Sequence, residues 1–333
     1  MADDVRVLSR RRVTLGMGGA ALGAAALGSS ARAATWPDRT VTIVVPFAAG
    51  GSADVYGRVL AQKLTAMFGK TFIVEDKPGA ASIIGSQYVA TSRPNGDTLL
   101  VISNTHTVNE TLFPHKPYKL LTNFEPIAPI NSSDLVLVTR PTLPVTTLGQ
   151  LIALAKKEPG KLTFASSGPG TPYHMAGELF KIMAGIDIVH VPFKGSSQAR
   201  IDVMSGQVDM MFDATTTMKA LIASGKVKGI ATTGLEQSKV LPNLPPIAKA
   251  GVPGYQAVIW LGLVAPRGTP VAIVDKLNSA IETIMKDPAL QKSWLAQGAV
   301  PVFMNPAQFT TFIKGDIVKW AKVIKQAKLH IHR

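Results

Sequence analysis

The chain has 333 residues, of which 46% are hydrophobic and 17% are charged, so it is long and apolar enough for two domains with buried cores. It contains no cysteine, which excludes disulfides, thiolate metal sites, a cysteine nucleophile and a lipid-modified cysteine anchor. The formal net charge is +14, but the lysines are spread thinly, without a dense cluster or an aromatic platform. We therefore expect a solvated basic surface that favours the approach of anions, and no nucleic-acid partner.

The N-terminus has the features of an export signal. The segment "SRRRVTL" precedes a mild Gly/Ala/Leu run, and the small-x-small pattern "ARA" ends at Ala33. Consecutive arginines resemble a twin-arginine signal, but Val13 stands where that signal usually has Phe, so the general secretory route stays open. The run is too short and too rich in glycine and alanine to span roughly 30 Å of hydrocarbon. We expect cleavage of residues 1–33 and a soluble periplasmic protein.

From residue 40 onward, short β-branched runs alternate with amphipathic helical patterns. This alternation predicts an α/β fold built from βαβ units around a parallel sheet. The predicted strands cover residues 40–45, 71–75, 98–103, 134–139, 162–165, 188–191, 210–213, 229–232 and 258–264.

The helical patterns carry their own start and stop signals. One helix is predicted to have Ser52 as its N-cap and to stop at Gly69, and another to stop at Gly185. The last helix begins at Asn305, and its apolar face marks it as a packing helix. The terminal histidines that follow it, His330 and His332, are therefore expected to be solvent-exposed. We expect no metal and no cofactor.

Two strands end in the same three residues, in "VPFAAGGS" at 45–52 and "VPFKGSS" at 191–197. Because proline ends sheet pairing and the Gly/Ser segment leads into a helix, each turn places unpaired backbone N–H groups at a helix N-terminus. Such ends bind anions. A third turn, from Ser166 to Thr171, follows the same design. "AAGGSAD" has neither the Walker ending nor the dinucleotide fingerprint, so nucleotide binding is unsupported.

The chain is predicted to fold as two lobes. Proline-rich passages near residues 114–144 and 242–253 mark where the chain leaves one lobe and returns. The first lobe is assigned residues 36–134 plus 258–333 and the second lobe residues 135–257, with two crossings that form a hinge. One anion-receiving turn in the first lobe and two in the second would then hold a small acidic molecule from both sides. We expect a monomer.

A series of motifs in fixed order resembles the extracytoplasmic solute receptors of the tripartite tricarboxylate transporter family, also called the Bug family. The motifs are "PFAAGGSAD", "RPNGDTLL", "SSGPGTPYHMAGELF", "VHVPFKGSSQA", "GQVDMMFD", "LPNLPPIAKAGVPGY" and "WLGLVAPRGTP". The resemblance covers residues 36–333. It implies a two-lobed, type II periplasmic-binding-protein-like fold that closes on a small carboxylate and delivers it to membrane permease subunits.

The resemblance also implies a set of ligand-binding residues in loops at strand ends. Lys194 is expected to assist mainly by long-range attraction, and Asp213 to orient the site without touching the anion. The family often has Asn where this chain has Ala214, and Asn-Pro around Glu110, which leaves open which carboxylate binds. The predicted ligand-binding residues are Phe47, Ala48, Gly50, Gly51, Ser52, Asp54, Ser103, Asn104, Ser166, Ser167, Thr171, His174, Phe193, Lys194, Gly195 and Asp213.

Two other functions remain open at this stage. A hydrolase would use Ser166, His174 and Asp213, although no G-x-S-x-G elbow supports a nucleophile. A receptor of the same design could instead present its ligand to a sensor kinase, which the sequence does not distinguish from transport. We interpret the chain as a binding protein and not as an enzyme.

Overall fold

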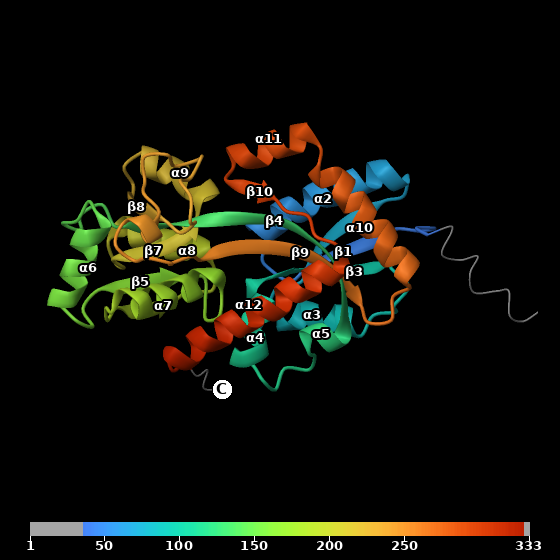
Figure 1. Ribbon diagram of the computed structural model, residues 1–333, viewed down its shortest axis with the longest axis horizontal. Helices are drawn as coiled ribbons and strands as arrows, with labels where there is room; N and C mark the ends of the chain where they lie inside the picture. Colours follow the sequence, from blue (N-terminus) through green and yellow to red (C-terminus); the bar gives the residue numbers. More distant parts are fainter. Residues whose placement is uncertain (1–35, 330–333) are drawn as a thin grey trace, which may run out of the picture. The chain divides into compact units, whose positions relative to one another are not determined.

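The computed structural model describes residues 36–329, shown in Figure 1. The chain from Pro37 onward forms one compact unit, and the description below concerns it. The predicted export signal at residues 1–33 and the terminal His330 and His332 lie outside the described residues.

The described strands form one mixed sheet in the order β2-β1-β3-β9-β4-β7-β5-β6, with β8 and β10 paired to β4. The chain contributes them as β1 (Val41–Val45), β2 (Phe72–Asp76), β3 (Thr98–Ser103), β4 (Phe124–Thr139), β5 (Thr163–Ser166), β6 (Val189–Pro192), β7 (Met210–Ala214), β8 (Lys228–Thr232), β9 (Val258–Pro266) and β10 (Ala299–Pro301).

Helices follow most of these strands. They are α2 (Ser52–Phe68), α3 (Ile83–Ala90), α4 (Asn104–Leu112), α5 (Leu120–Asn123), α6 (Leu148–Lys157), α7 (Pro172–Ala184), α8 (Ser196–Ser205), α9 (Thr215–Ala223), α10 (Val271–Met285), α11 (Pro288–Ala296) and α12 (Pro306–Gln326), with a 3₁₀ turn at Ile247–Lys249.

The prediction of a parallel sheet is only partly correct. Strands β1, β2 and β3 are parallel to one another, as are β5, β6 and β7, but β9, β8 and β10 each pair antiparallel with their neighbours. The first half of β4 was also not predicted, since the predicted strand covers only residues 134–139. Pro126 and Pro129 interrupt its pattern, and the register with β9 shifts next to both, so bulges accommodate the two prolines within the strand.

Strand β4 changes its partners midway. Its residues 124–134 pair with β9 and β10, whereas residues 135–139 pair with β7 and β8. In Figure 1, β4 and β9 are the long strands that run between the two groups of elements. We propose that the first lobe and the second lobe divide here, at 134/135 and 257/258, and this change of partners supports that division.

The strand directions make the carboxyl ends of the two parallel groups point toward each other. Strand β3 is antiparallel to β9, and β9 to β4, so β3 runs in the direction of β4, whereas β7 runs against it. Ser103 at the end of β3 and Asn131 on β4 both pair with Leu261, and Ala214 at the end of β7 pairs with Leu135. The carboxyl ends of β3 and β7 are thus four positions of β4 apart, roughly 13 Å along that strand. These two facing ends are called the carboxyl edges below.

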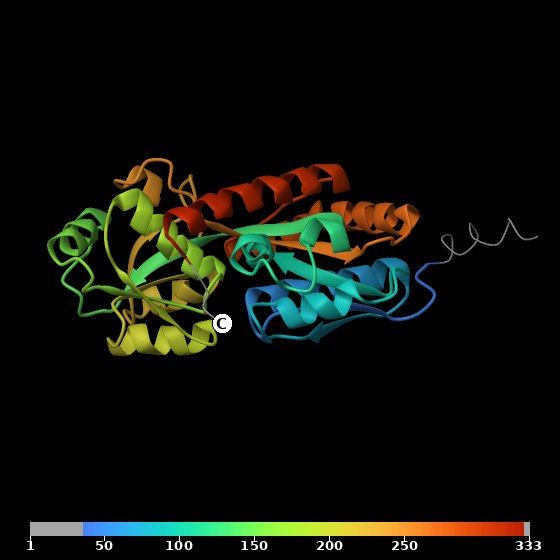
Figure 2. The same cartoon turned by 90° about the horizontal axis from the view of Figure 1, so that it is seen from below.

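Each group of strands packs against its own apolar clusters, and a further cluster joins the two groups. One cluster is drawn from residues 135–259, and another from strands and helices of the first lobe. Helix α12, red in Figure 2, packs against both α4 and α7. The shared cluster consists of Val108, Leu112, Met175, Trp320, Val323 and Ile324.

Candidate functional site

The first "VPF" turn leads from β1 into a helix with an uncapped N-terminus. The N-cap of α2 is Gly51, one residue before the predicted cap Ser52, and glycine has no side chain to cap the first N–H groups. Gly50 has a φ of +75°, a left-handed conformation that glycine adopts at no steric cost. The Asp54 carboxylate accepts the Gly50 N–H at 2.8 Å and also pairs with Arg58. Asp54 therefore holds the turn in shape, and the first N–H groups of α2 remain open to an anion.

The second "VPF" turn repeats this arrangement between β6 and α8. The N-cap of α8 is Gly195, again without a side-chain cap. Phe193 packs its side chain against an apolar cluster of the second lobe, and its N–H donates to the Ser166 carbonyl at 3.0 Å. Lys194 is exposed. The two turns that share a sequence thus also share an open helix N-terminus, which is the property that anion binding requires.

The third turn, between β5 and α7, differs from the expectation. The Gly168 N–H donates to the Ser166 hydroxyl at 3.1 Å, and the Gly170 N–H donates to His174 Nδ1 at 3.1 Å. Thr171 caps α7 by accepting the His174 N–H. These backbone donors are already engaged within the turn, so it forms a braced wall and not an open anion cradle. Ser167 and Thr171 remain half-buried at its surface.

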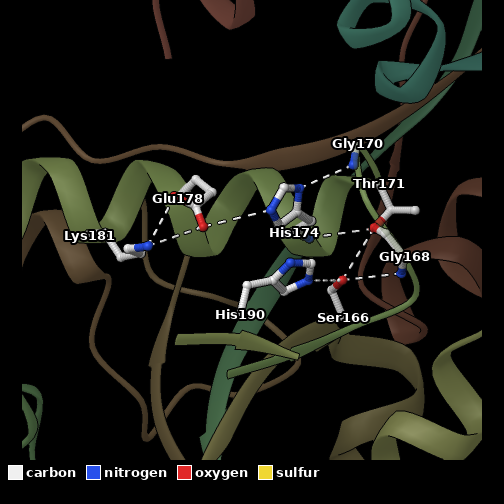
Figure 3. A network of polar contacts seen from close by, with 8 residues as sticks. All are labelled: Ser166, Gly168, Gly170, Thr171, His174, Glu178, Lys181 and His190. Atoms are coloured by element: carbon white, nitrogen blue, oxygen red, sulfur yellow. Dashed lines mark hydrogen bonds and ion pairs between the residues drawn. The ribbon is translucent and has the colours of Figure 1, made fainter. Parts of the chain in front are cut away.

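Two histidines brace this third turn from behind (Figure 3). The rings of His174 and His190 stack with centroids 4.0 Å apart, and His190 Nε2 lies 2.6 Å from the Ser166 hydroxyl. His174 Nδ1 accepts a backbone N–H, so the neutral ring carries its proton on Nε2, which lies 3.7 Å from a Glu178 carboxylate oxygen. Burial lowers the pKa of His174 to about 3 and the pKa of His190 to about 4. Both rings are therefore neutral near pH 7.

The predicted Ser/His/Asp set is not assembled, so that hypothesis is wrong. Ser166 is hydrogen-bonded to His190, because β5 and β6 are paired neighbours, whereas His174 faces Gly170 and Glu178. Asp213 contacts neither histidine. Its carboxylate, which is 0% exposed, accepts the Ala214 N–H at 2.7 Å and the Arg200 Nε–H at 2.6 Å.

Arg200 is a residue of this edge that the sequence interpretation missed. It lies on α8, thirteen positions before Asp213, and its side chain is 22% exposed. Burial raises the pKa of Asp213, and the guanidinium of Arg200 opposes that rise. A buried aspartate at a strand end needs a cation or several donors, and the arginine in the helix after the second "VPF" turn, just before this strand, was the available signal.

Ser103 and Asn104 have structural partners. Ser103 caps α4 by accepting the Thr105 N–H. Asn104 donates to the Val258 carbonyl at 3.1 Å and accepts the Trp260 N–H at 3.0 Å, which ties α4 to β9. Both side chains are almost fully buried. We infer that they hold the first lobe at the crossing and that ligand contacts come from the more exposed turns.

A small pocket lies beside the first "VPF" turn, where the two facing edges approach. Among the residues predicted to bind ligand, Ser52 is the one that lines it. The Asn131 amide nitrogen is buried there without a hydrogen-bond partner in residues 36–329. The pocket is lined by Ser52, Tyr56, Asn131, Ser133, Ala214, Thr216, Ile259 and Leu261.

Two kinds of feature are absent from the part of the chain that the structure describes. Residues 36–329 contain no group of three or more histidine, aspartate or glutamate side chains arranged to hold a metal ion. No helix within the same residues is long and apolar enough to cross a membrane.

Comparison with known proteins identifies the family. The family model described as "Tripartite tricarboxylate transporter family receptor" matches residues 56–329. Protein BugT of Bordetella pertussis is 34% identical over 304 residues, which are 91% of this chain and 93% of BugT. A protein from Pseudomonas sp. strain P51, encoded between tcbD and tcbE, is 33% identical over 99% of this chain and 98% of its own.

Solved structures agree with this match. An R. palustris protein solved with adipate is 33% identical, with a TM-score of 0.84, over 89% of this chain and 99% of its own. MatC from Rhodopseudomonas palustris with bound malate is 30% identical, with a TM-score of 0.78, over 87% and 100%. The periplasmic binding protein BugD has a TM-score of 0.81 at 33% identity, over 89% and 99%. The mixed α/β fold is that of periplasmic solute-binding proteins, which are receptors and not enzymes, and the chain belongs to the tripartite tricarboxylate transporter receptor family.

Proposed function

We propose that this protein is a periplasmic receptor that captures a small carboxylate between its two lobes and delivers it to the permease subunits of a tripartite tricarboxylate-type transporter. The observation that carries the proposal is the pair of uncapped helix N-termini, at Gly51 and Gly195, on edges that point toward each other. The relatives solved with adipate and with malate support a carboxylate as the ligand class.

The two turns bind the anion through the backbone. Helix N–H groups converge on the ligand oxygen atoms, and the dipoles of α2 and α8 add partial positive charge at both ends of the site. The braced turn from Ser166 to Thr171 supplies a fixed wall, and the half-buried Ser167 adds a directional hydrogen bond. A net positive surface raises the local concentration of anions before they bind.

A thermal-shift screen of residues 34–333 tests the proposal. The acids are malate, adipate, citrate, benzoate, aspartate and nicotinate. The acid that binds is expected to add about 2.7 kcal/mol to the free energy of unfolding at 100 times its Kd, because it binds only the folded state. If none of these acids raises the melting temperature, and calorimetry detects no binding either, the proposed ligand class is wrong.

Ligand binding is also expected to close the lobes. Two lobes joined by β4 and β9 would rotate as rigid bodies about the crossings, while the cluster shared by α4, α7 and α12 stays packed. Solution X-ray scattering should therefore report a smaller radius of gyration with the bound acid than without it. A tight ligand that leaves the scattering curve unchanged would rule out closure, and a variant that does not bind the acid provides the control.

The export route gives a separate prediction. Replacing Arg10 and Arg11 with lysine is expected to trap the uncleaved precursor in the cytoplasm, because the twin-arginine route requires that pair. Fractionation and the size of the protein on a gel measure this, with Arg6→Lys as the matched control. Normal export of the double variant would point to the general secretory route.

A further inference from the structure

We propose that Arg200 binds a carboxylate group of the ligand directly from the second lobe, and that Asp213 is its positioning residue. This proposal rests on the proposed function and adds to it a partly buried, paired guanidinium from within α8. The exposed Lys194 of the turn keeps only the long-range role that the sequence analysis assigns to it.

The position of Arg200 places its charge at the carboxyl edge. It is the fifth residue of α8, just over one turn from the uncapped N-terminus at Gly195. Long side chains on a helix lean toward its N-terminus, which here is the end that receives the anion. Its bond to Asp213, in the last positions of β7, fixes the guanidinium at the same edge.

The guanidinium has donors left over. Arginine carries five N–H donors, and in this structure its Nε–H bonds to Asp213 at 2.6 Å. Within residues 36–329, the two terminal nitrogens donate to no protein acceptor, and the side chain is 22% exposed. The unused part is the planar fork that binds a carboxylate through two parallel hydrogen bonds.

Asp213 is held so firmly that it can act as a fixed support. Its carboxylate is 0% exposed and also accepts the Ala214 N–H. The phenol of Tyr173, at the start of α7, interacts with it as well. The arginine neutralises this carboxylate, so the ligand anion meets a paired charge and not a bare one. A buried ion pair contributes little to stability, which leaves positioning of the fork as the use that fits its geometry.

Lys194 offers no comparable geometry. Its side chain is exposed and makes no hydrogen bond or ion pair with the rest of residues 36–329. A mobile ammonium attracts anions at a distance but selects among them weakly, since exposed charges are screened by water and salt.

The main test variant removes both charges of the buried pair together. In Arg200→Gln/Asp213→Asn, both charges are removed together, so no buried carboxylate is left unpaired and the fold is expected to persist. Arg200→Gln alone leaves Asp213 unpaired and is used only if it folds. Asp213→Asn keeps the cation and frees it partly, and Lys194→Gln is the control for an exposed charge.

The measurement is calorimetric titration with adipate, malate and monomethyl adipate. Wild type is expected to prefer a diacid over the monoester by at least tenfold. The double variant is expected to lose at least tenfold in diacid affinity and to lose that preference, because the ester and the variant remove the same ion pair. Lys194→Gln is expected to change affinity less than threefold.

Each outcome decides something different. A double variant that binds diacid as wild type does, or that retains the preference over the monoester, overturns the role of Arg200 and leaves the proposed function standing. Asp213→Asn is expected to bind the diacid less tightly than wild type but to keep part of the preference over the monoester, because the cation remains while its fork is no longer held. Asp213→Asn that binds the diacid as wild type does overturns the positioning role of Asp213. Wild type that binds none of the screened acids or these probes contradicts the proposed function, and the role of Arg200 is then rejected with it.

Discussion

Replacing Gly51 with valine is expected to abolish carboxylate binding while leaving the fold intact. Gly51 has a φ of −78°, which any residue adopts, and an added Cβ would meet only the Ala48 carbonyl oxygen, at 3.3 Å. The turn therefore accepts valine with a small adjustment. The two methyl groups would then cover the N-terminus of α2 and keep a ligand oxygen away from its N–H groups.

Two further glycines complete this experiment. At Gly195, φ is 173° and nothing lies within 4 Å of an added Cβ, so Gly195→Val tests the second "VPF" turn without strain. Gly149 in α6 also has open space around it and lies outside both turns, and Gly149→Val is the matched control. Calorimetry measures binding, and circular dichroism measures helix content.

If backbone N–H groups hold the anion, the three variants should rank in a definite order of affinity. Gly51→Val and Gly195→Val should each abolish detectable binding, whereas Lys194→Ala removes an exposed charge and should weaken binding less than threefold. Normal binding by Gly51→Val together with complete loss in Lys194→Ala would show that the site is an ordinary ion pair and that the helix N-termini are incidental.

The sequence predicted the strands and helices around the site better than it predicted which residues are paired with one another. The strand at residues 98–103 was predicted with its observed ends, and both "VPF" turns lead into helices as expected. These features depend on neighbouring residues, which the hydrophobic period and the turn residues encode. The short β10 and the first half of β4 were missed because Pro301, Pro126 and Pro129 oppose a strand locally and only pairing with β4 or β9 overrides them.

The side-chain partners could not be predicted because they depend on register. Ser166 could have faced His174 or His190, and the sequence contains no signal that chooses between them. The pairing of β5 with β6 brings His190 to Ser166. The bond between Arg200 and Asp213 likewise arises because α8 packs on the strands that end beside it. Long-range pairing therefore decides which predicted site residues face the ligand and which ones support the turns.

The second large effect is expected on the free energy of unfolding when the pH is lowered. The pKa values of His174 and His190, about 3 and about 4, lie below the value of roughly 6.5 for an unfolded chain. Below pH 6.5 the unfolded chain takes up protons that the folded chain does not, so the free energy of unfolding falls as the pH falls. The contribution is fully present above pH 6.5 and is lost progressively toward pH 3 to 4. At pH 4.5 the loss in the free energy of unfolding amounts to roughly 2.5 kcal/mol for each histidine, on the order of 5 kcal/mol for the pair.

The variant His174→Asn/His190→Gln isolates this effect, because asparagine places an acceptor near the position of Nδ1 and glutamine a polar group near Nε2. Urea unfolding from pH 7.5 to 4.5 is expected to show a steep loss of stability in wild type and a flatter profile in the variant. Glu178, whose pKa is raised by burial, acts in the opposite direction but is present in both proteins. His115→Gln, at an exposed histidine, should keep the wild-type profile. Parallel profiles for wild type and the double variant would mean that folding does not hold the stacked pair neutral, and this account of the acid sensitivity would then be wrong.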